Sequence, residues 1–263
     1  MKNRKLMDNL CLILVFTFLF LPILVLIIFS FNSSSLNIIF EGFTFSWYKT
    51  LFSNVTLLES LKNTLIVAFT STIASTIIGT ISAYALYKYN FPFKKFINEL
   101  LYIPIVIPEI VLGISLLCVY TLLQLELGLF TLILAHICFC IPFVIVSVRT
   151  SLSSMNPNLE LAASDLYANR FKTFFYVVLP SLLPGILSGA ELSFTLSLDD
   201  VVVSYFTAGP SSTTLPLKVY SMIKTGVTPD VNALITIMLV IIFSLLMIST
   251  FISLKGIKKE GTR

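Results

Sequence analysis

Two adjacent acids, Asp199 and Asp200, stand inside the otherwise apolar run LSFTLSLDDVVVSYF. An acid at the centre of a membrane helix costs about 2.5–3.5 kcal/mol on insertion scales, so two ionised acids there would cost about 5–7 kcal/mol. Carboxylates in such a place suit a cation, because they replace the water around a protonated amine with charge-assisted hydrogen bonds. The structural alternative is an ion pair between helices or a hydrogen bond to Ser or Thr, and the sequence leaves both readings open.

Glu191 lies on the same apolar run, and helix geometry separates the three acids. At about 100° per residue, Asp200 lies near +100° and Glu191 near −80° from Asp199 on one continuous helix. The three carboxylates then cover about half the circumference and do not line one narrow cavity. The sequence predicts Asp199 as the acid that faces the lumen and leaves Glu191 deeper, where pairing with another helix is the alternative.

A fourth acid, Glu109, follows two prolines in YIPIVIPEIVLGISLL. Pro104 and Pro108 lack an N–H, so two backbone carbonyls one turn earlier lose their usual partners and become free acceptors. A kinked helix with free oxygens beside a carboxylate suits a cation path. Aromatic side chains, Tyr205 among them, are able to hold a cationic group over the ring face.

The composition indicates an integral membrane protein: 57% of the 263 residues are hydrophobic, 11% are charged, and the mean hydropathy is +0.97. The single histidine, His136, lies in an apolar run without a partner cluster, and Cys138 and Cys140 point to nearly opposite sides of a helix, so no metal site or nucleophile-base set is predicted. No GxxxxGK[ST] motif occurs, so the chain is not expected to bind ATP and Mg²⁺ or to act as an enzyme.

Six segments reach the roughly 20 apolar residues that a span needs. They predict an all-α membrane protein with a single transmembrane domain over residues 1–263. The expected spans are Leu10–Phe31, Thr64–Tyr87, Phe96–Leu123, Leu129–Val148, Leu183–Phe206 and Val231–Leu254.

The basic residues predict the orientation of these spans, because cytoplasmic loops retain Lys and Arg. Thirteen of the 17 fall on the side of the two termini and of the loops 88–95 and 149–182. Both termini are therefore expected in the cytoplasm, and Asp199 is expected toward the outer half of the fifth span. Within the loop 149–182, Asn156-Pro157 is a helix-start signal for a short helix over residues 158–168, and Thr228-Pro229-Asp230 is a similar signal before the sixth span.

Residues 156–210, which begin NPNLELAASDLYANRF and include SFTLSLDDVVVS, resemble the EAA-loop region of ABC importer permeases. The similarity continues through LPLKVYSMIK and GVTPDVNAL and back through PEIVLGISLL, so it covers nearly the whole chain apart from its termini. An EAA loop alone indicates an ABC importer permease. The later runs together are more specific to the polyamine branch, the spermidine/putrescine permeases.

The resemblance implies a MetI-like fold and a permease subunit of an ATP-driven importer in the bacterial cytoplasmic (inner) membrane. The partners that it implies are a second homologous permease, two copies of a cytoplasmic ATPase that binds ATP and Mg²⁺, and an extracellular polyamine-binding protein. No cofactor and no nucleic acid are expected on this chain.

In such importers the EAA loop forms a coupling helix that sits in a groove of the ATPase. The sequence departs from the family twice: Leu161 stands where the first Glu is usual, with Glu160 one residue early, and Tyr167 stands where Gly is usual. Tyrosine resists a backbone angle that glycine allows, so the loop is expected either to bend differently or to dock on a correspondingly altered ATPase. The residues carried over to ATPase coupling are Glu160, Leu161, Ala162, Ala163, Asp165, Leu166 and Tyr167.

The sequence thus predicts a polyamine permease that works by alternating access. Its predicted substrate path comprises Asp199, Asp200, Glu109, Glu191 and Tyr205. An ABC permease for another solute, such as thiamine or iron, is the nearest alternative, and a cation channel is an alternative of another class. An anion importer would be expected to carry Arg or Lys well inside its spans, and a channel does not need a cytoplasmic EAA-like helix.

Overall fold

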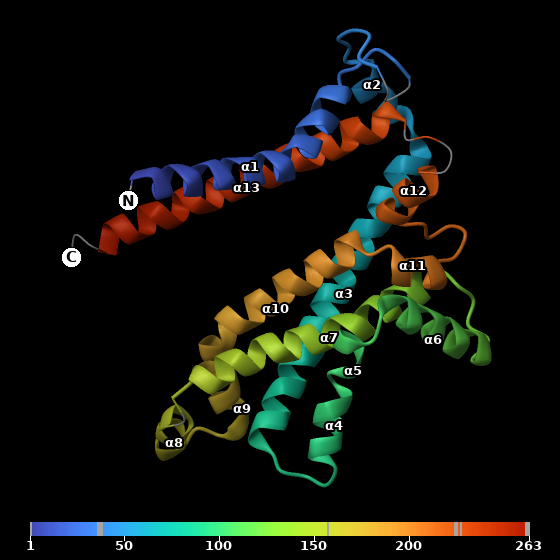
Figure 1. The fold of residues 1–263 in the computed structure, drawn as a ribbon. Coiled ribbons are helices and arrows are strands. Elements are labelled where there is room, and N and C mark those ends of the chain that lie inside the picture. Colours follow the sequence, from blue (N-terminus) through green and yellow to red (C-terminus); the bar gives the residue numbers. More distant parts are fainter. Residues whose placement is uncertain (1, 36–38, 157, 224–225, 227, 261–263) are drawn as a thin grey trace. The chain divides into compact units, whose positions relative to one another are not determined.

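The computed structural model describes residues 2–35, 39–156, 158–223, 226 and 228–260, and their side chains except at 2–6, 245–246 and 248–260 (Figure 1). The described residues are mainly helical, and Asn32 and Phe43 form an isolated β-bridge. Contacts divide the chain into two compact units, Met1–Leu58 with Ser221–Arg263, and Glu59–Tyr220. A single domain over residues 1–263 stays a prediction.

The first unit contains the two terminal helices, α1 (Lys2–Phe29) and α13 (Pro229–Glu260), which pack on each other, and α2 (Ser46–Ser53), which packs on α13. The helix start predicted at Thr228-Pro229-Asp230 is confirmed. Asp230 is buried in the first turn of α13 and accepts a hydrogen bond of 2.7 Å from the amide of Asn54. A carboxylate in this place is favoured by the positive end of the helix dipole.

The second unit is built on α3 (Val55–Lys88, from Glu59 onward), α7 (Leu129–Ser154) and α10 (Leu179–Asp199). Helices α7 and α10 lie alongside each other (Figure 1) and pack closely through small residues. A Cβ added at Gly185 would lie 2.8 Å from the carbonyl oxygen of Ser147, and one at Gly189 would lie 3.1 Å from the Cα of Val144. Small residues allow this approach, since dispersion and close packing hold membrane helices together.

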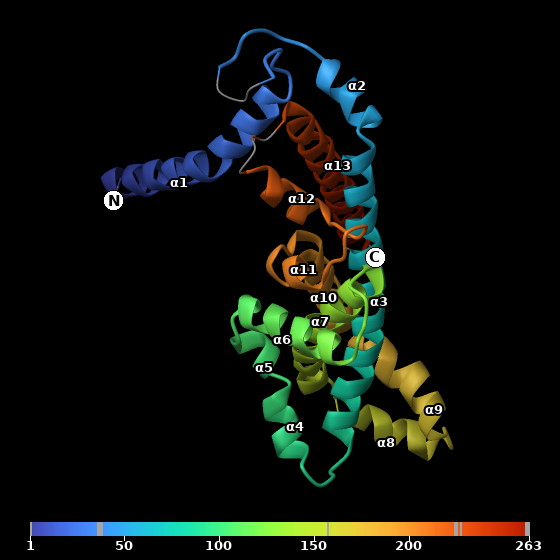
Figure 2. The same cartoon turned by 90° about the vertical axis from the view of Figure 1, so that its right-hand side faces the viewer.

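The loop between α7 and α10 contains α8 (Asn158–Asp165) and α9 (Arg170–Thr173), followed by one π-helical turn, η1 (Phe174–Val178). The helix predicted over residues 158–168 is thus confirmed but ends three residues early. Its start signal is confirmed at Asn156, whose Oδ1 accepts a hydrogen bond from the N–H of Asn158; Pro157 lies outside the described residues. Two views place α8 beside the C-terminal end of α3 (Figures 1 and 2).

The structure interrupts the helix in two of the predicted spans, Phe96–Leu123 and Leu183–Phe206. The kink expected at Pro104 and Pro108 is confirmed as a break in the first, whereas the continuous helix assumed for the second is wrong. The first is divided into α4 (Lys94–Leu100), α5 (Ile103–Val106) and α6 (Glu109–Leu122), with a bend of 111° between Lys94–Val106 and α6. The second ends as a helix at Asp199 and resumes as α11 (Val202–Thr207). The first break has a local cause, because Ile107 precedes Pro108, which disfavours the helical conformation, and both residues are extended.

Four helical segments of the described chain are long and apolar enough to cross a membrane: Met7–Phe29, Val55–Lys88, Leu129–Ser154 and Arg170–Asp199. The bent pair makes a fifth if it counts as one span, and Pro229–Ser244 is a shorter apolar helix. The helical segment that contains most of the fifth predicted span thus begins at Arg170, before Leu183. Two short helices in the predicted outer loops, α2 and α12 (Leu215–Met222), were not expected from the sequence.

We predict that Gly185→Ala destabilises the protein, because the added methyl group enters occupied space between α10 and α7. Overpacking of this kind costs about 1–3 kcal/mol. The matched control is Gly128→Ala, where an added Cβ meets no atom within 4 Å and the backbone is extended. Thermal unfolding in detergent should show a lower midpoint for Gly185→Ala alone, and equal midpoints for the two variants would contradict the packing argument.

Candidate cation-binding site

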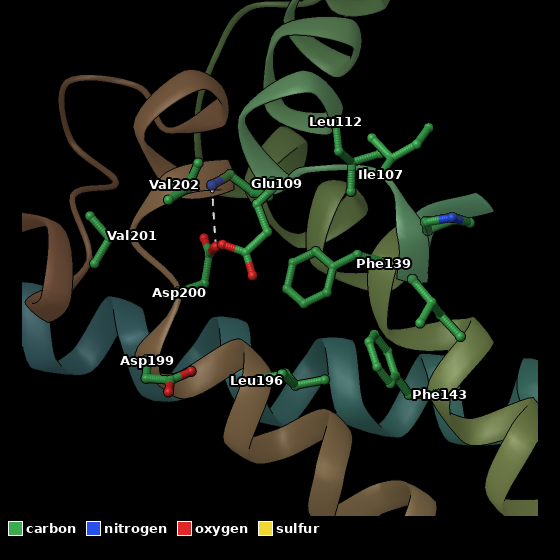
Figure 3. Close-up of a pocket in the computed structure, with 13 residues that line it drawn as sticks. Ile107, Glu109, Leu112, Phe139, Phe143, Leu196, Asp199, Asp200, Val201 and Val202 are labelled. Carbon is green, nitrogen blue, oxygen red and sulfur yellow. Dashed lines mark hydrogen bonds between the residues drawn. The ribbon is translucent and has the colours of Figure 1, made fainter. Parts of the chain in front are cut away.

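A cavity of about 380 Å³ opens where the two broken segments meet. Three carboxyl side chains line it: Glu109 at the start of α6, Asp199 at the end of α10, and Asp200 between α10 and α11. Figure 3 shows the carboxyl groups of Glu109 and Asp200 directed toward each other, with Asp199 on the neighbouring turn. The remaining lining residues are Pro104, Ile105, Ile107, Leu112, Phe139, Phe143, Leu196, Val201, Val202 and Val203.

The local backbone explains why the acids converge. Pro108 is the N-cap of α6, so Glu109 occupies the first helical turn, where the helix dipole favours a negative charge. Asp200 has the extended angles φ −64° and ψ 129°, which end α10. The predicted separation of about 100° between the two aspartates assumed a continuous helix and is therefore wrong.

The carboxylate of Asp200 is held by the N-terminus of α11. Its Oδ2 accepts hydrogen bonds of 2.7 Å from both the N–H and the hydroxyl of Ser204, and its Oδ1 accepts one of 3.2 Å from the N–H of Val203 (dashed line in Figure 3). Only 6% of the Asp200 side chain is exposed. Asp200 thus combines the two roles that the sequence left open: it makes a hydrogen bond to a serine, and it lines the cavity.

His136, which the sequence reasoning set aside, lies directly behind Asp200. Its fully buried ring contacts Ser197 of α10 through Nδ1 at 2.7 Å and Ser204 of α11 through Nε2 at 3.1 Å. Ser197 in turn lies 3.0 Å from Ser71 of α3. The sequence did not point to this histidine, because its hydrogen-bond partners lie on two other helices, α10 and α11, far along the chain.

Two residues of the predicted substrate path do not line this cavity. Glu191 is exposed on α10, two turns before Asp199. Tyr205 is 62% exposed and its ring packs edge-on against Phe206. The structure therefore brings Glu109, Asp199 and Asp200 together and leaves Glu191 and Tyr205 outside their cavity.

The residues assigned to ATPase coupling separate into two groups. Glu160 and Ala163 are buried, and Glu160 forms an ion pair with Lys88 at the end of α3. The remainder of the group is exposed and comprises Leu161, Ala162, Asp165, Leu166 and Tyr167.

Tyr167 has φ +57°, the left-handed conformation that glycine adopts without cost. The backbone at this position therefore has the angle that glycine would adopt, although the residue is tyrosine. The structure thus gives no support to the expectation that Tyr167 makes the loop bend differently. The side chain itself is 99% exposed.

Residues 75–259 match the family of binding-protein-dependent transport system inner membrane components. The chain belongs to this family. A spermidine/putrescine transport system permease protein PotC from Shigella flexneri is 43% identical over 230 residues, which are 88% of this chain and 87% of the relative. A PotC protein from Haemophilus influenzae is 40% identical, with 86% and 88% covered.

A putrescine transport system permease protein, PotI from Escherichia coli K12, is 36% identical, with 79% of this chain and 76% of the relative covered. These relatives are transport permeases. The family thus describes an inner membrane component of a transport system, and the several apolar helices fit a multi-pass membrane protein.

Solved structures show the same fold. A bacterial ABC transporter involved in the import of the acidic polysaccharide alginate has a chain that superimposes with a TM-score of 0.74 at 16% identity, covering 94% of this chain and 96% of that one. The MetNI methionine ABC transporter in an inward-facing conformation gives 0.60 at 19% identity, covering 73% and 92%. The MetI-like ABC importer permease fold is thereby confirmed.

In this permease, Asp200→Ala should lower the thermal unfolding midpoint more than Asp200→Asn. Asparagine still accepts hydrogen bonds at a helix N-terminus, whereas loss of a cap to alanine costs about 0.5–2 kcal/mol. Unfolding of both variants in detergent measures the difference. Equal midpoints would mean that the hydrogen bonds to Val203 and Ser204 do not stabilise α11.

Proposed function

We propose that this chain is the permease subunit of an ATP-driven importer of polyamines such as spermidine and putrescine, and that the protonated amine crosses through the acidic cavity by alternating access. The observation that carries the proposal is the convergence of Glu109, Asp199 and Asp200 on one cavity. The relatives named as polyamine permeases support the choice of substrate.

The cavity suits an aliphatic chain that carries ammonium groups. Its carboxylates supply charge-assisted hydrogen bonds to the ammonium groups, and its apolar wall, which includes Phe139, Phe143 and Leu196, packs against methylene groups. An aromatic ring face also attracts a cation. Among the residues that the structure describes, those lining the cavity include no Lys or Arg, so an anionic solute would meet repulsion without a compensating charge.

The assembly that we propose contains a second homologous permease, two copies of a cytoplasmic ATPase that binds ATP and Mg²⁺, and an extracellular polyamine-binding protein. A related alginate transporter has been solved in complex with a periplasmic protein that binds an alginate pentasaccharide, which supports a binding-protein partner in general. Six spans with both termini in the cytoplasm of a bacterial inner membrane complete the proposal. This chain has no catalytic residue or metal of its own in this scheme.

The coupling surface that we propose is the exposed side of α8 and the turn after it. Leu161 is 63% exposed, Leu166 82% and Tyr167 99%, in a loop that the sequence places in the cytoplasm. Apolar side chains exposed together outside a membrane are typical of protein contacts. The ion pair between Glu160 and Lys88 ties this surface to α3, so that a force from the ATPase would reach the spans.

The double variant Glu109→Gln/Asp199→Asn should raise the KM for spermidine uptake at least about tenfold, because each amide loses a charge-assisted bond worth about 1.5–3 kcal/mol. Uptake by the assembled importer in proteoliposomes measures it.

The matched control is Glu191→Gln, which removes a carboxylate from the same helix outside the cavity and should leave KM near that of the parent. An unchanged KM in the double variant would contradict an acidic substrate path. If the parent importer takes up a different solute but not spermidine, the alternative that this chain is an ABC permease for another solute is favoured over the polyamine permease.

Leu166→Asp should reduce recovery of the ATPase with the permease about tenfold, since a charge desolvated at an apolar contact costs several kcal/mol. Pull-down of the ATPase with tagged permease measures this loss. Leu166→Met keeps the apolar side chain and should recover the parent amount. Equal recovery with Leu166→Asp would contradict coupling through this surface.

A further inference from the structure

A buried polar chain runs from α3 to the acidic cavity through His136. The hydroxyl of Ser71 contacts that of Ser197 at 3.0 Å, and Ser197 contacts His136 Nδ1 at 2.7 Å. On the other side of the ring, Nε2 lies 3.1 Å from the Ser204 hydroxyl, which contacts Asp200 Oδ2 at 2.7 Å. One imidazole thus links three helices to a carboxylate of the cavity.

The hydrogen count fixes which atom donates at the cavity end of this chain. Ser204 has one hydroxyl proton, and the carboxylate of Asp200 takes it as an acceptor. The Ser204 oxygen must then accept from His136, so Nε2 carries a proton and donates. Nε2 itself is 3.6 Å from Asp200 Oδ2, beyond a direct hydrogen bond, so Ser204 relays the contact.

We propose that His136 is a positioning residue for the transported amine: its Nε2–H orients the Ser204 hydroxyl, which fixes the Asp200 carboxylate at the cavity wall. His136 does not itself line the cavity, so it acts through Asp200. This inference rests on the proposed function of the cavity and extends it to a residue behind the wall.

Burial gives the arrangement its rigidity. His136 and Ser204 are both 0% exposed, so no solvent is available to replace a lost hydrogen bond. In such surroundings an unsatisfied polar atom is costly, and each member of the network holds its neighbours in place. Without the Nε2–H donor, the Ser204 hydroxyl is free to rotate and Asp200 loses one of the groups that orient it.

Two matched variants separate the two sides of the ring. His136→Gln supplies an amide N–H near the former Nε2, whereas His136→Asn supplies a polar group near the former Nδ1 and leaves Ser204 without its donor. We expect His136→Asn to raise the KM for spermidine uptake about tenfold, the equivalent of one lost hydrogen bond to a charged network, with little change in kcat. His136→Gln should restore KM to within about threefold of the parent.

A double-mutant cycle in the assembled importer tests whether His136 acts through Asp200. In an Asp200→Asn background, His136→Asn should add less than about twofold to KM, because the coupled residue is already changed. In a Glu109→Gln background the full increase should remain. A general loss of folding would instead lower the recovered complex in all backgrounds and would not be rescued by His136→Gln.

The outcomes distinguish the two proposals. The positioning role is overturned, and the acidic path stays intact, if Asp200→Asn raises KM but His136→Asn does not. The same holds if both variants raise KM and their effects multiply in the double variant. An unchanged KM for Asp200→Asn overturns both the positioning role of His136 and the place of Asp200 on the acidic path. If the importer complex that contains His136→Asn cannot be purified, Ser204→Ala replaces it in the same cycle. An unchanged KM for Ser204→Ala likewise overturns the proposed relay from His136 through Ser204 to Asp200.

Discussion

Lipid offers no hydrogen bonds, so a helix that breaks at membrane depth must find other partners for its backbone groups. The two breaks in this permease, at Pro108 and at Asp200, lie beside one cavity, and each is followed directly by a new helix. Asp200 satisfies the first N–H groups of α11, and the polar network behind it is buried in protein. Asp200 therefore lies where the interruption of the backbone needs an accepting group, and Glu109 lies in the first turn of α6, where the helix dipole favours a negative charge. The same carboxylates suit a cationic cargo.

Much of the fold follows from the sequence. The apolar runs lead to α1, α3, α7, α10 and α13, and Asn156 and Pro229 mark two helix starts. The breaks were harder to predict. Pro104 and Pro108 indicated a kink, yet the bend of 111° depends on where α6 packs, against α11. At Asp200 no proline or glycine interrupts the run, and the break follows from the hydrogen bonds that its side chain makes with α11.

The same division holds for the site. Acid type and apolar sequence surroundings selected Glu109, Asp199 and Asp200, because a charge within an apolar run needs a reason wherever it falls. The same criteria also selected Glu191, which lies outside the cavity. The placement of the acids relative to one another was not accessible, since the argument used a continuous helix. His136 was missed because its role depends on Ser71, Ser197 and Ser204, which are distant in sequence. Tyr167 is a different case: its residue type predicted a changed backbone angle, yet the structure has the left-handed angle that glycine adopts easily.

The way in which α10 and α11 are joined has a consequence for the cavity. Helix α10 packs on α7 through Gly185 and Gly189. Helix α11 packs on α7 as well and also on α6, where a Cβ added at Gly113 would lie 2.7 Å from the Phe206 ring. Asp200 and Val201 are the two residues that join these helices. On the amine path that we propose, the carboxylate of Asp200 would shift with any change in the backbone torsion angles that set the direction of α11 relative to α10, so contact with the amine and the angle between the two helices would depend on the same few bonds.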